Sequence, residues 1–558
     1  MTMFDGPERR ADPGVGAGGS AGARDPNDDT DGLGEGWWGS DHLDARRIDL
    51  VAAPVRYPRS PLVALLAIAV LPAIGLLVLA RWADGEADAY EASEPVGILE
   101  RRLEGSVGGV DADGDGTDDG EPSAAPTTGL LDFRRTPAVV AADASAEQLG
   151  VGLAPILPFL SDQSCVAVAV DGVDVATLNP GLGVIPASNQ KLLTALAALD
   201  VLGPEYRFTT QLAVPPVDAD GDVDGDIYLI GGGDPLLTSD DYPIDEARRP
   251  EIYTTSLDVL ADAVADAGIT RIRGTVIGDA TRYDDDEFID DWADDVIVAE
   301  VGPIGALMAN DGRVRGRRGV QDDPTSAAAR EFVRLLSDRG VRVDNGFGSG
   351  VASTLVPVLA TVESQPLSAV IEEMLVNSDN NTAELLVKEM GVAVSGVGSW
   401  DAGLAAMLDS LAAQGVDVDA LVLRDGSGLS PLNRATCDAV LDVLQLGRAW
   451  AFGDALPVAN QTGTLVDEFV ESPVAGRLVA KTGTRGNPPL EEDPPGVKAL
   501  AGYLPPEAGS SEGTIEFVVI ANQDLITDET IYRPLWAAFA ERFDLFPEGP
   551  DASSLGPR

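Results

Sequence analysis

The chain has 558 residues, with 38 Lys and Arg against 92 Asp and Glu, which gives a formal net charge of −54. This length predicts several structural units, because single hydrophobic cores usually stop growing at roughly 250–300 residues. An acidic balance of this size argues against nucleic-acid binding, since the phosphates would be repelled before contact. The apolar content of 44% is ample for a buried core, so the chain as a whole is not disordered.

Scarce residue types exclude several chemistries. The single histidine, His42, lies in a Gly- and Asp-rich stretch, which excludes Ser-His-Asp triads and His-rich zinc sites. Two cysteines, Cys165 and Cys437, are too few for a Cys-based zinc site. We therefore expect no metal and no cofactor. Only four lysines occur, and their positions matter below: Lys191, Lys388, Lys481 and Lys498.

The N-terminal part of the chain predicts a membrane anchor. Residues 1–58 lack a repeating apolar face and are expected to form a disordered acidic cytoplasmic tail. Residues 61–80 are uncharged and apolar, and a helix of that length spans about 30 Å, the thickness of a bilayer core. Arginines precede this segment and acids follow it, which predicts a single-pass protein of the cell membrane with everything after residue 81 outside the cytoplasm. A cleaved signal peptide is the alternative, although this segment is longer and begins later than such signals do.

Residues 81–145 are expected to form an acidic extracytoplasmic linker. Within it, residues 111–120 place aspartates at calcium-loop spacing, but Pro122 stands where the closing Glu would be. A solvated acidic spacer is therefore favoured over a calcium loop. Outside the cytoplasm, Cys165 and Cys437 can pair in a disulfide, and two buried free thiols explain the sequence equally well.

From about residue 146 the pattern predicts a folded α/β protein. Residues 165–180 indicate a β-hairpin turned at Asp171-Gly172, and an apolar helix follows Ser188. Residues 204–355 are strand-rich with one helix around 324–339, and helices dominate again from 366. Two or three strands and a helix around 529–543 end the pattern. We therefore expect one α/β domain, residues 146–203 and 356–548, interrupted by a β-rich inserted domain, residues 204–355.

A serine and a lysine can replace a histidine-based nucleophile. Ser188-Asn189-Gln190-Lys191 precedes an apolar helix, so the serine falls near the helix N-terminus and the lysine lies on the same face. A lysine amine held partly neutral can activate the serine, and the helix N-terminus favours developing negative charge. An N-capping serine followed by a surface lysine is the structural alternative.

Two further motifs carry polar groups that suit a cleft. Ser378-Asp379-Asn380 joins two apolar helices, where a hydroxyl and an amide can shuttle a proton and hold a carbonyl; an ordinary turn is the alternative. Residues 481–484 read Lys-Thr-Gly-Thr at the end of a strand. Lys481 supplies a cation there, Thr482 and Thr484 supply hydroxyls, and Gly483 allows a substrate backbone to approach.

The order SxxK, SDN, KTG, with two of the four lysines inside the motifs, resembles the penicillin-binding proteins and serine β-lactamases. The resemblance extends to the D-alanyl-D-alanine carboxypeptidase/endopeptidase family with a large insert between the first two motifs, the class C low-molecular-mass group. It covers roughly residues 150–545 and includes the stretches PASNQKLLTALAAL, NSDNNTAELL, RDGSGLSPLNRAT and AKTGT. It implies an α/β, penicillin-binding-protein/β-lactamase-like fold.

The resemblance also implies roles for single residues. Ser188 is expected to be the nucleophile and Lys191 the base that takes its proton, while Ser378 with Lys481 relays a proton to the leaving amine. The backbone N–H groups of Ser188 and Thr484 are expected to form the oxyanion hole.

The implied substrates are peptidoglycan stem peptides ending in D-Ala-D-Ala, with β-lactams as covalent inhibitors. Asn380 is expected to bind the substrate amide and Thr484 the terminal carboxylate. An insertion at 485–496 departs from the family pattern and predicts a loop at the cleft rim. The loop at Asp425–Gly428 is expected to have a packing role or to line the site. A serine β-lactamase and a catalytically silent wall-binding protein with the same fold remain the alternatives.

Overall fold

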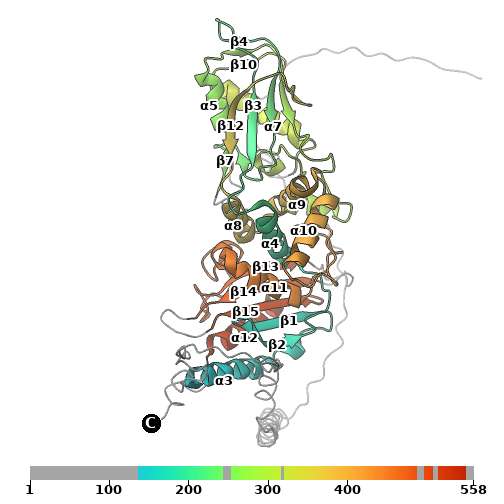
Figure 1. The fold of residues 1–558 in the computed structure, drawn as a ribbon, viewed down its shortest axis with the longest axis vertical. Helices are drawn as coiled ribbons and strands as arrows, with labels where there is room; N and C mark the ends of the chain where they lie inside the picture. The colour runs from blue at the N-terminus through green and yellow to red at the C-terminus, as the bar shows by residue number, and fades with distance from the viewer. Residues whose placement is uncertain are drawn as a thin grey trace, which may run out of the picture. The chain divides into compact units, whose positions relative to one another are not determined.

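The computed structural model describes most of the chain after the acidic linker: residues 136–242, 253–313, 315, 319–486, 496–506 and 513–547 (Figure 1). The predicted tail, the membrane segment at 61–80, the calcium-spaced aspartates and most of the 485–496 loop lie outside these residues. Within the described part, no single helix is long and apolar enough to cross a membrane. One sharply bent pair of helices, Asn380–Ser395 with Trp400–Ala413, meets the same length and composition criteria together.

The first sheet joins segments from the two ends of the described chain. Its five strands have the order β13-β14-β15-β1-β2 and pair antiparallel throughout. The strands are β1 (Cys165–Val170), β2 (Val173–Leu178), β13 (Val479–Arg485), β14 (Val497–Leu504) and β15 (Ile515–Asn522). The predicted hairpin is confirmed, because Asp171 and Gly172 connect β1 and β2 with φ angles of 47° and 77°, the left-handed values that two-residue hairpin turns require.

Helices cover both faces of this sheet (Figure 1). On β1, Cys165, Ala167 and Ala169 face one core, whereas Val166 and Val168 face the other. This explains why the strand is a continuous apolar run rather than an alternating one. The first core is covered by α4 (Gln190–Leu202), α8 (Leu367–Asn377), α9 (Asn380–Ser395), α10 (Trp400–Ala413) and α11 (Cys437–Gly447); the second is covered by α3 (Thr136–Leu153) and α12 (Glu529–Asp544).

The residues between α4 and α8 build a second five-stranded sheet with its own core, in the order β11-β9-β5-β3-β12. Its strands are β3 (Thr209–Ala213), β5 (Ile227–Ile230), β9 (Val276–Asp279), β11 (Phe347–Ser349) and β12 (Val358–Glu363). A three-stranded sheet contains β4 (Asp222–Val223), β8 (Arg271–Ile272) and β10 (Arg342–Val343), and a two-stranded one contains β6 (Leu237–Thr238) and β7 (Thr255–Ser256). Short 3₁₀ turns complete the described elements: η1 (Leu157–Phe159), η2 (Ala187–Asn189), η3 (Asn310–Gly312), η4 (Arg448–Trp450), η5 (Phe452–Ala455) and η6 (Gly463–Leu465).

The expectation of a single helix in this middle region was wrong. Besides α7 (Pro324–Asp338), the structure contains α5 (Asp258–Asp266) and α6 (Asp294–Glu300). The helix α5 is short and rich in Asp, which hid its apolar face of Leu260, Ala261 and Val264. In addition, β12 pairs with β3, so the second sheet reaches Glu363, beyond the boundary predicted at residue 355.

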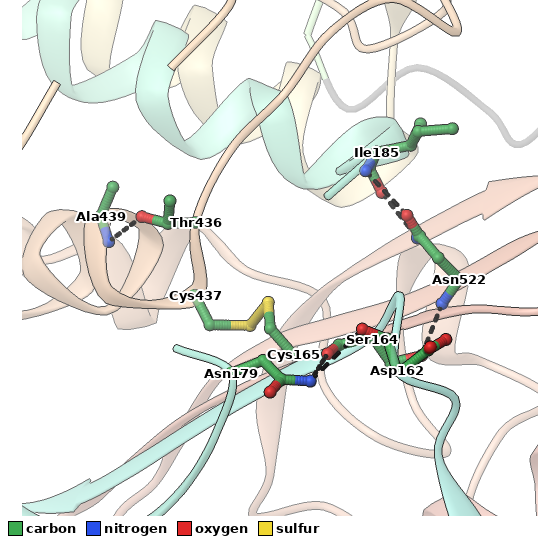
Figure 2. Close-up of a disulfide and its surroundings, with 9 residues drawn as sticks. All are labelled: Asp162, Ser164, Cys165, Asn179, Ile185, Thr436, Cys437, Ala439 and Asn522. Carbon is green, nitrogen blue, oxygen red and sulfur yellow. Dashed lines mark hydrogen bonds between the residues drawn. A yellow bond between two sulfur atoms is a disulfide. The ribbon is translucent and has the colours of Figure 1, made fainter. Parts of the chain in front are cut away.

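A disulfide joins Cys165 on β1 to Cys437 at the start of α11, with the two Cα atoms 5.8 Å apart (Figure 2). Of the two alternatives that the sequence left open, the structure therefore contains the bonded one. Close by, Asn522 at the end of β15 accepts a hydrogen bond from the Ile185 N–H at 2.8 Å and donates to the Ile185 carbonyl at 2.9 Å. This amide fixes the segment that leads to Ser188 onto the sheet.

Candidate active site

Ser188 lies in the 3₁₀ turn η2, directly before α4, as the sequence predicts. Ala187, the residue before it, has a φ of 46°, a left-handed conformation that costs energy for a residue with a side chain. Gly428 packs against this turn, because a Cβ atom there would lie 1.9 Å from the Ala187 carbonyl oxygen. The strained turn leaves the Ser188 side chain half-buried at the end of the helix.

Lys191 is buried and surrounded by oxygen atoms. Its Nζ atom lies 3.1 Å from Ser188 Oγ, 2.7 Å from Asn380 Oδ1 and 2.8 Å from the Ser427 carbonyl oxygen. Burial is the largest influence on its pKa and lowers it to about 8, although the carboxylates of Glu384 and Asp425 oppose this change. The amine is therefore partly neutral near physiological pH, and its nearest hydroxyl is that of Ser188.

A second lysine pairs with the second serine motif. Lys481 Nζ donates to Ser378 Oγ at 2.8 Å and to the Thr482 carbonyl at 2.8 Å. Ser378 ends α8 in a left-handed conformation with φ of 61°, and Asp379 then caps α9 by accepting the Asn381 N–H. The chain changes direction sharply at Ser378, between the two helices. The Ser378 hydroxyl therefore lies within hydrogen-bond distance of Lys481 on β13.

Asn380 is held from two sides. Its Oδ1 atom accepts from Lys191, and its Nδ2 atom donates to the Glu300 carbonyl at 2.7 Å. The neighbouring Asn381 accepts the Gly302 N–H at 2.7 Å. The segment at 300–302 therefore fixes the second motif, which the sequence alone did not indicate because the two stretches are some 80 residues apart.

The third motif lies on β13, at the edge of the first sheet. Thr482 Oγ1 lies 2.8 Å from Thr464 Oγ1, and the exposed Thr484 accepts from Lys498 at 3.2 Å. A Cβ atom on Gly483 would lie 3.0 Å from the Pro186 carbonyl oxygen and 3.3 Å from the Ser188 nitrogen. The glycine thus allows the strand to pack against the turn that carries Ser188.

The three motifs therefore meet at one place. Hydrogen bonds join Lys191 to Ser188 and Asn380, a separate bond joins Lys481 to Ser378, and Gly483 packs beside Ser188. The loop of Asp425–Gly428 lines the site, as expected, through the Ser427 carbonyl on Lys191. Sequence reasoning missed Glu384, which is buried behind that loop. The available signal was a Glu within an apolar helix segment, since acids rarely occupy such positions unless they are paired or have a role.

Replacing Gly428 by Ala tests whether the turn at Ala187 depends on close packing. We expect the free energy of unfolding to fall by about 2–4 kcal/mol, because an alanine at position 428 would be strained in the left-handed conformation and its Cβ would also clash with the Ala187 carbonyl. Gly396→Ala is the control, because Gly396 has a φ of 76° but nothing within 4 Å of an added Cβ, and about 1 kcal/mol is expected there. Urea denaturation measures both. Equal losses in the two variants would contradict the packing argument.

A mixed α/β core whose SxxK serine, SDN loop and KTG edge strand converge defines the penicillin-binding-protein/β-lactamase-like class. The sequence matches the D-Ala-D-Ala carboxypeptidase 3 (S13) family over residues 163–318 and 315–535. The chain belongs to this family, and it is accordingly a serine-type D-Ala-D-Ala carboxypeptidase.

One relative is similar to this chain in sequence, and solved structures are similar to it in fold. The chain is 31% identical over 452 residues to a D-alanyl-D-alanine carboxypeptidase of Actinomadura sp. strain R39, covering 65% of this chain and 79% of the relative. Its fold is similar to that of penicillin binding protein 4 of Haemophilus influenzae, with a TM-score of 0.56, 19% identity, and coverage of 70% and 98%. A structure of the same protein with a bound β-lactam has a TM-score of 0.52 at 20% identity, and coverage of 71% and 99%.

Proposed function

We propose that this chain hydrolyses the D-Ala-D-Ala end, or the cross-links, of peptidoglycan stem peptides through an acyl-enzyme on Ser188. The observation that carries the proposal is the buried Lys191 amine at 3.1 Å from the Ser188 hydroxyl. Because the pKa of Lys191 is lowered to about 8, a usable fraction of the amine can accept a proton near neutral pH.

In the first step Lys191 takes the Ser188 proton while the Ser188 oxygen attacks the carbonyl carbon of the penultimate D-Ala. The backbone N–H groups of Ser188 and Thr484 receive the developing oxyanion. When the peptide bond breaks, the leaving amine needs a proton, which Ser378 supplies and Lys481 restores through their 2.8 Å hydrogen bond. Water then attacks the ester carbon and passes its proton through Ser378 to Lys481, and the ester C–O bond breaks. Ser188 takes back its proton from Lys191, which releases the shortened peptide and restores both lysines.

Substrate recognition follows from the edge strand. An extended peptide can lie along β13, because an edge strand presents unpaired backbone groups. Thr482 and Thr484 hydroxyls are the proposed donors to the terminal carboxylate, and Asn380 binds the substrate amide. In the uncomplexed site Asn380 is already bonded to Lys191 and to the Glu300 carbonyl. An amide oxygen accepts two hydrogen bonds and an amide nitrogen donates two, so Asn380 can bind a substrate amide while it keeps both contacts.

The remaining proposals concern the location of the protein in the cell, its domain organisation and its inhibition. Residues 61–80 are proposed to anchor the protein in the cell membrane with the peptidase domain outside the cytoplasm. The residues from β3 to β12 are proposed to form an inserted domain. β-Lactams are proposed to acylate Ser188, in keeping with the β-lactam complex of the Haemophilus influenzae protein.

Labelling with a fluorescent penicillin tests the proposed nucleophile. The full chain and its Ser188→Ala variant are incubated with the probe and separated on a denaturing gel. We expect a persistent band on the parent and none on the variant. Ser337→Ala is the control and should keep its label, since Ser337 is an exposed serine on α7, away from the three motifs.

Two other outcomes would replace the proposal. Hydrolysis of the probe without a lasting band would indicate a β-lactamase. Neither label nor hydrolysis would indicate a catalytically silent fold.

A further inference from the structure

Glu384 is fully buried on α9, four residues after Asn380. Its Oε1 atom accepts the Ser427 N–H at 2.8 Å, and its Oε2 atom accepts the Gly426 N–H at 3.1 Å and Trp400 Nε1–H at 2.8 Å. Among the described residues, no lysine or arginine lies within ion-pair distance of this carboxylate. Burying this carboxylate without a cation costs free energy, because neutral donors only partly replace its hydration. A charge kept at that cost points to a role in the site.

The loop that Glu384 holds lies between it and helix α4. The peptide unit joining Gly426 to Ser427 donates its N–H to Glu384, and its carbonyl accepts Thr194 Oγ1–H at 2.7 Å. The next peptide unit donates the Gly428 N–H to Asp425 Oδ1 at 2.7 Å, and its carbonyl, that of Ser427, accepts from Lys191. Each peptide therefore has a carboxylate at its N–H end, which strengthens its carbonyl as an acceptor.

Charges around Lys191 come from several elements. Burial lowers its pKa, and the acids that raise it are, in decreasing order, Glu384 on α9, Asp425 in the loop, Asp379 at the cap of α9 and Glu300 at the end of α6. The cation of Lys481 approaches from β13 through Ser378. Of these acids, Glu384 has the largest effect on the pKa of Lys191. Burial together with Asp425 raises the pKa of Glu384 itself to about 7. Lys388, on the same helix, also senses its charge.

We propose that Glu384 is a positioning residue of the acylation step: it holds the Ser427 carbonyl on Lys191 Nζ, and its charge stabilises the ammonium that forms there. In that step the Ser188 O–H bond breaks, the proton forms an N–H bond on Lys191, and the serine oxygen bonds to the substrate carbonyl carbon while the carbonyl π electrons move to its oxygen. When those electrons return, the C–N bond breaks and the leaving nitrogen takes a proton from Ser378. A positive charge therefore appears in a buried site, where a nearby carboxylate has its greatest effect. The inference rests on the proposed role of Lys191 as the base.

The test is the pH profile of the second-order acylation rate of the full chain, with penicillin as probe. In the parent the rate rises with pH as Lys191 loses its proton. Glu384→Gln removes the negative charge, so the ammonium is less stable and the rising limb should move to lower pH by roughly one unit. The plateau rate should fall roughly tenfold, because Lys191 becomes a weaker base.

Two further variants separate charge from position. Glu384→Asp keeps the charge but shortens the side chain, so we expect a lower plateau with the limb unmoved. Glu389→Gln is the matched control on the same helix; Glu389 binds Tyr206, Arg282 and Tyr283 rather than the loop. It should leave the limb in place. Thermal unfolding shows that each variant is folded.

An unmoved limb in a folded Glu384→Gln protein would overturn the assignment. If that variant does not fold, Glu384→Asp decides, and an unchanged plateau rate would refute the positioning role. If Lys191 were not the base, the Lys191→Met protein would be acylated at the normal rate. That result would refute the proposed function itself, and so it differs from a failure of the role assigned to Glu384. A shift of equal size in Glu389→Gln would show a general charge effect and also refute the proposal.

Discussion

Replacing Lys191 by Met is expected to lower the rate of Ser188 acylation and of D-Ala release by roughly a thousandfold or more. The amine lies 3.1 Å from the Ser188 hydroxyl, and a thioether cannot accept the proton of that hydroxyl. Lys191→Arg should be as inactive, because a guanidinium stays protonated at all pH values of interest. The pair of variants therefore separates a proton acceptor from a mere positive charge. Stopped-flow acylation with a chromogenic cephalosporin measures both.

The sign of the pH dependence follows from the same group. Burial holds the pKa of Lys191 at about 8 instead of 10.5, and only the neutral amine accepts a proton. Acylation by the parent should therefore rise with pH through about 8, and this limb should be absent from any residual reaction of Lys191→Met. Substantial activity of the arginine variant would contradict a general-base role.

Removing the Cys165–Cys437 disulfide is expected to lower the free energy of unfolding by about 2–5 kcal/mol. The bond links residues separated by 272 positions, so it restricts the unfolded chain strongly, and it ties α11 to β1 of the first sheet. Replacing both cysteines by Ala, rather than one, avoids leaving a reactive thiol. Urea unfolding with and without reductant measures the effect.

The parent should become less stable in reductant, whereas the double variant should not respond. Acylation of the folded double variant should remain near normal, because Asn522 still fixes Ile185 beside the active-site turn. Equal stability of oxidised parent and double variant would show that the bond contributes little.

Local patterns were sufficient for the elements that carry the motifs. The apolar run after Ser188, the Asp171-Gly172 turn and the strand ending in Lys481 are specified by short stretches, since helix and hairpin formation depend on near neighbours. The family match also confirms the resemblance based on the three motifs. The roles assigned to single residues stay predictions.

Long-range contacts were beyond such patterns. The helix α5 was missed because its apolar face is only three residues wide. The strand β12 was left out of the middle region because its partner β3 lies about 150 residues away. The segment at 283–308 was assigned to the middle region, yet Tyr283, Trp292 and Ile304 pack in the first core. Side-chain pattern alone does not state which core a strand or loop joins.

The sequence by itself therefore indicated the chemistry: one histidine in an unsuitable place and four lysines, two of them inside the SxxK and KTG motifs in a recognisable order. The tertiary structure decided how that chemistry is tuned. Only folding brings Glu384, Asp425 and the Ser427 carbonyl around Lys191, and only burial lowers the pKa of that amine to about 8. The physical reason is that desolvation and Coulomb interactions depend on distances in space, which residues far apart in the chain acquire only in the folded protein.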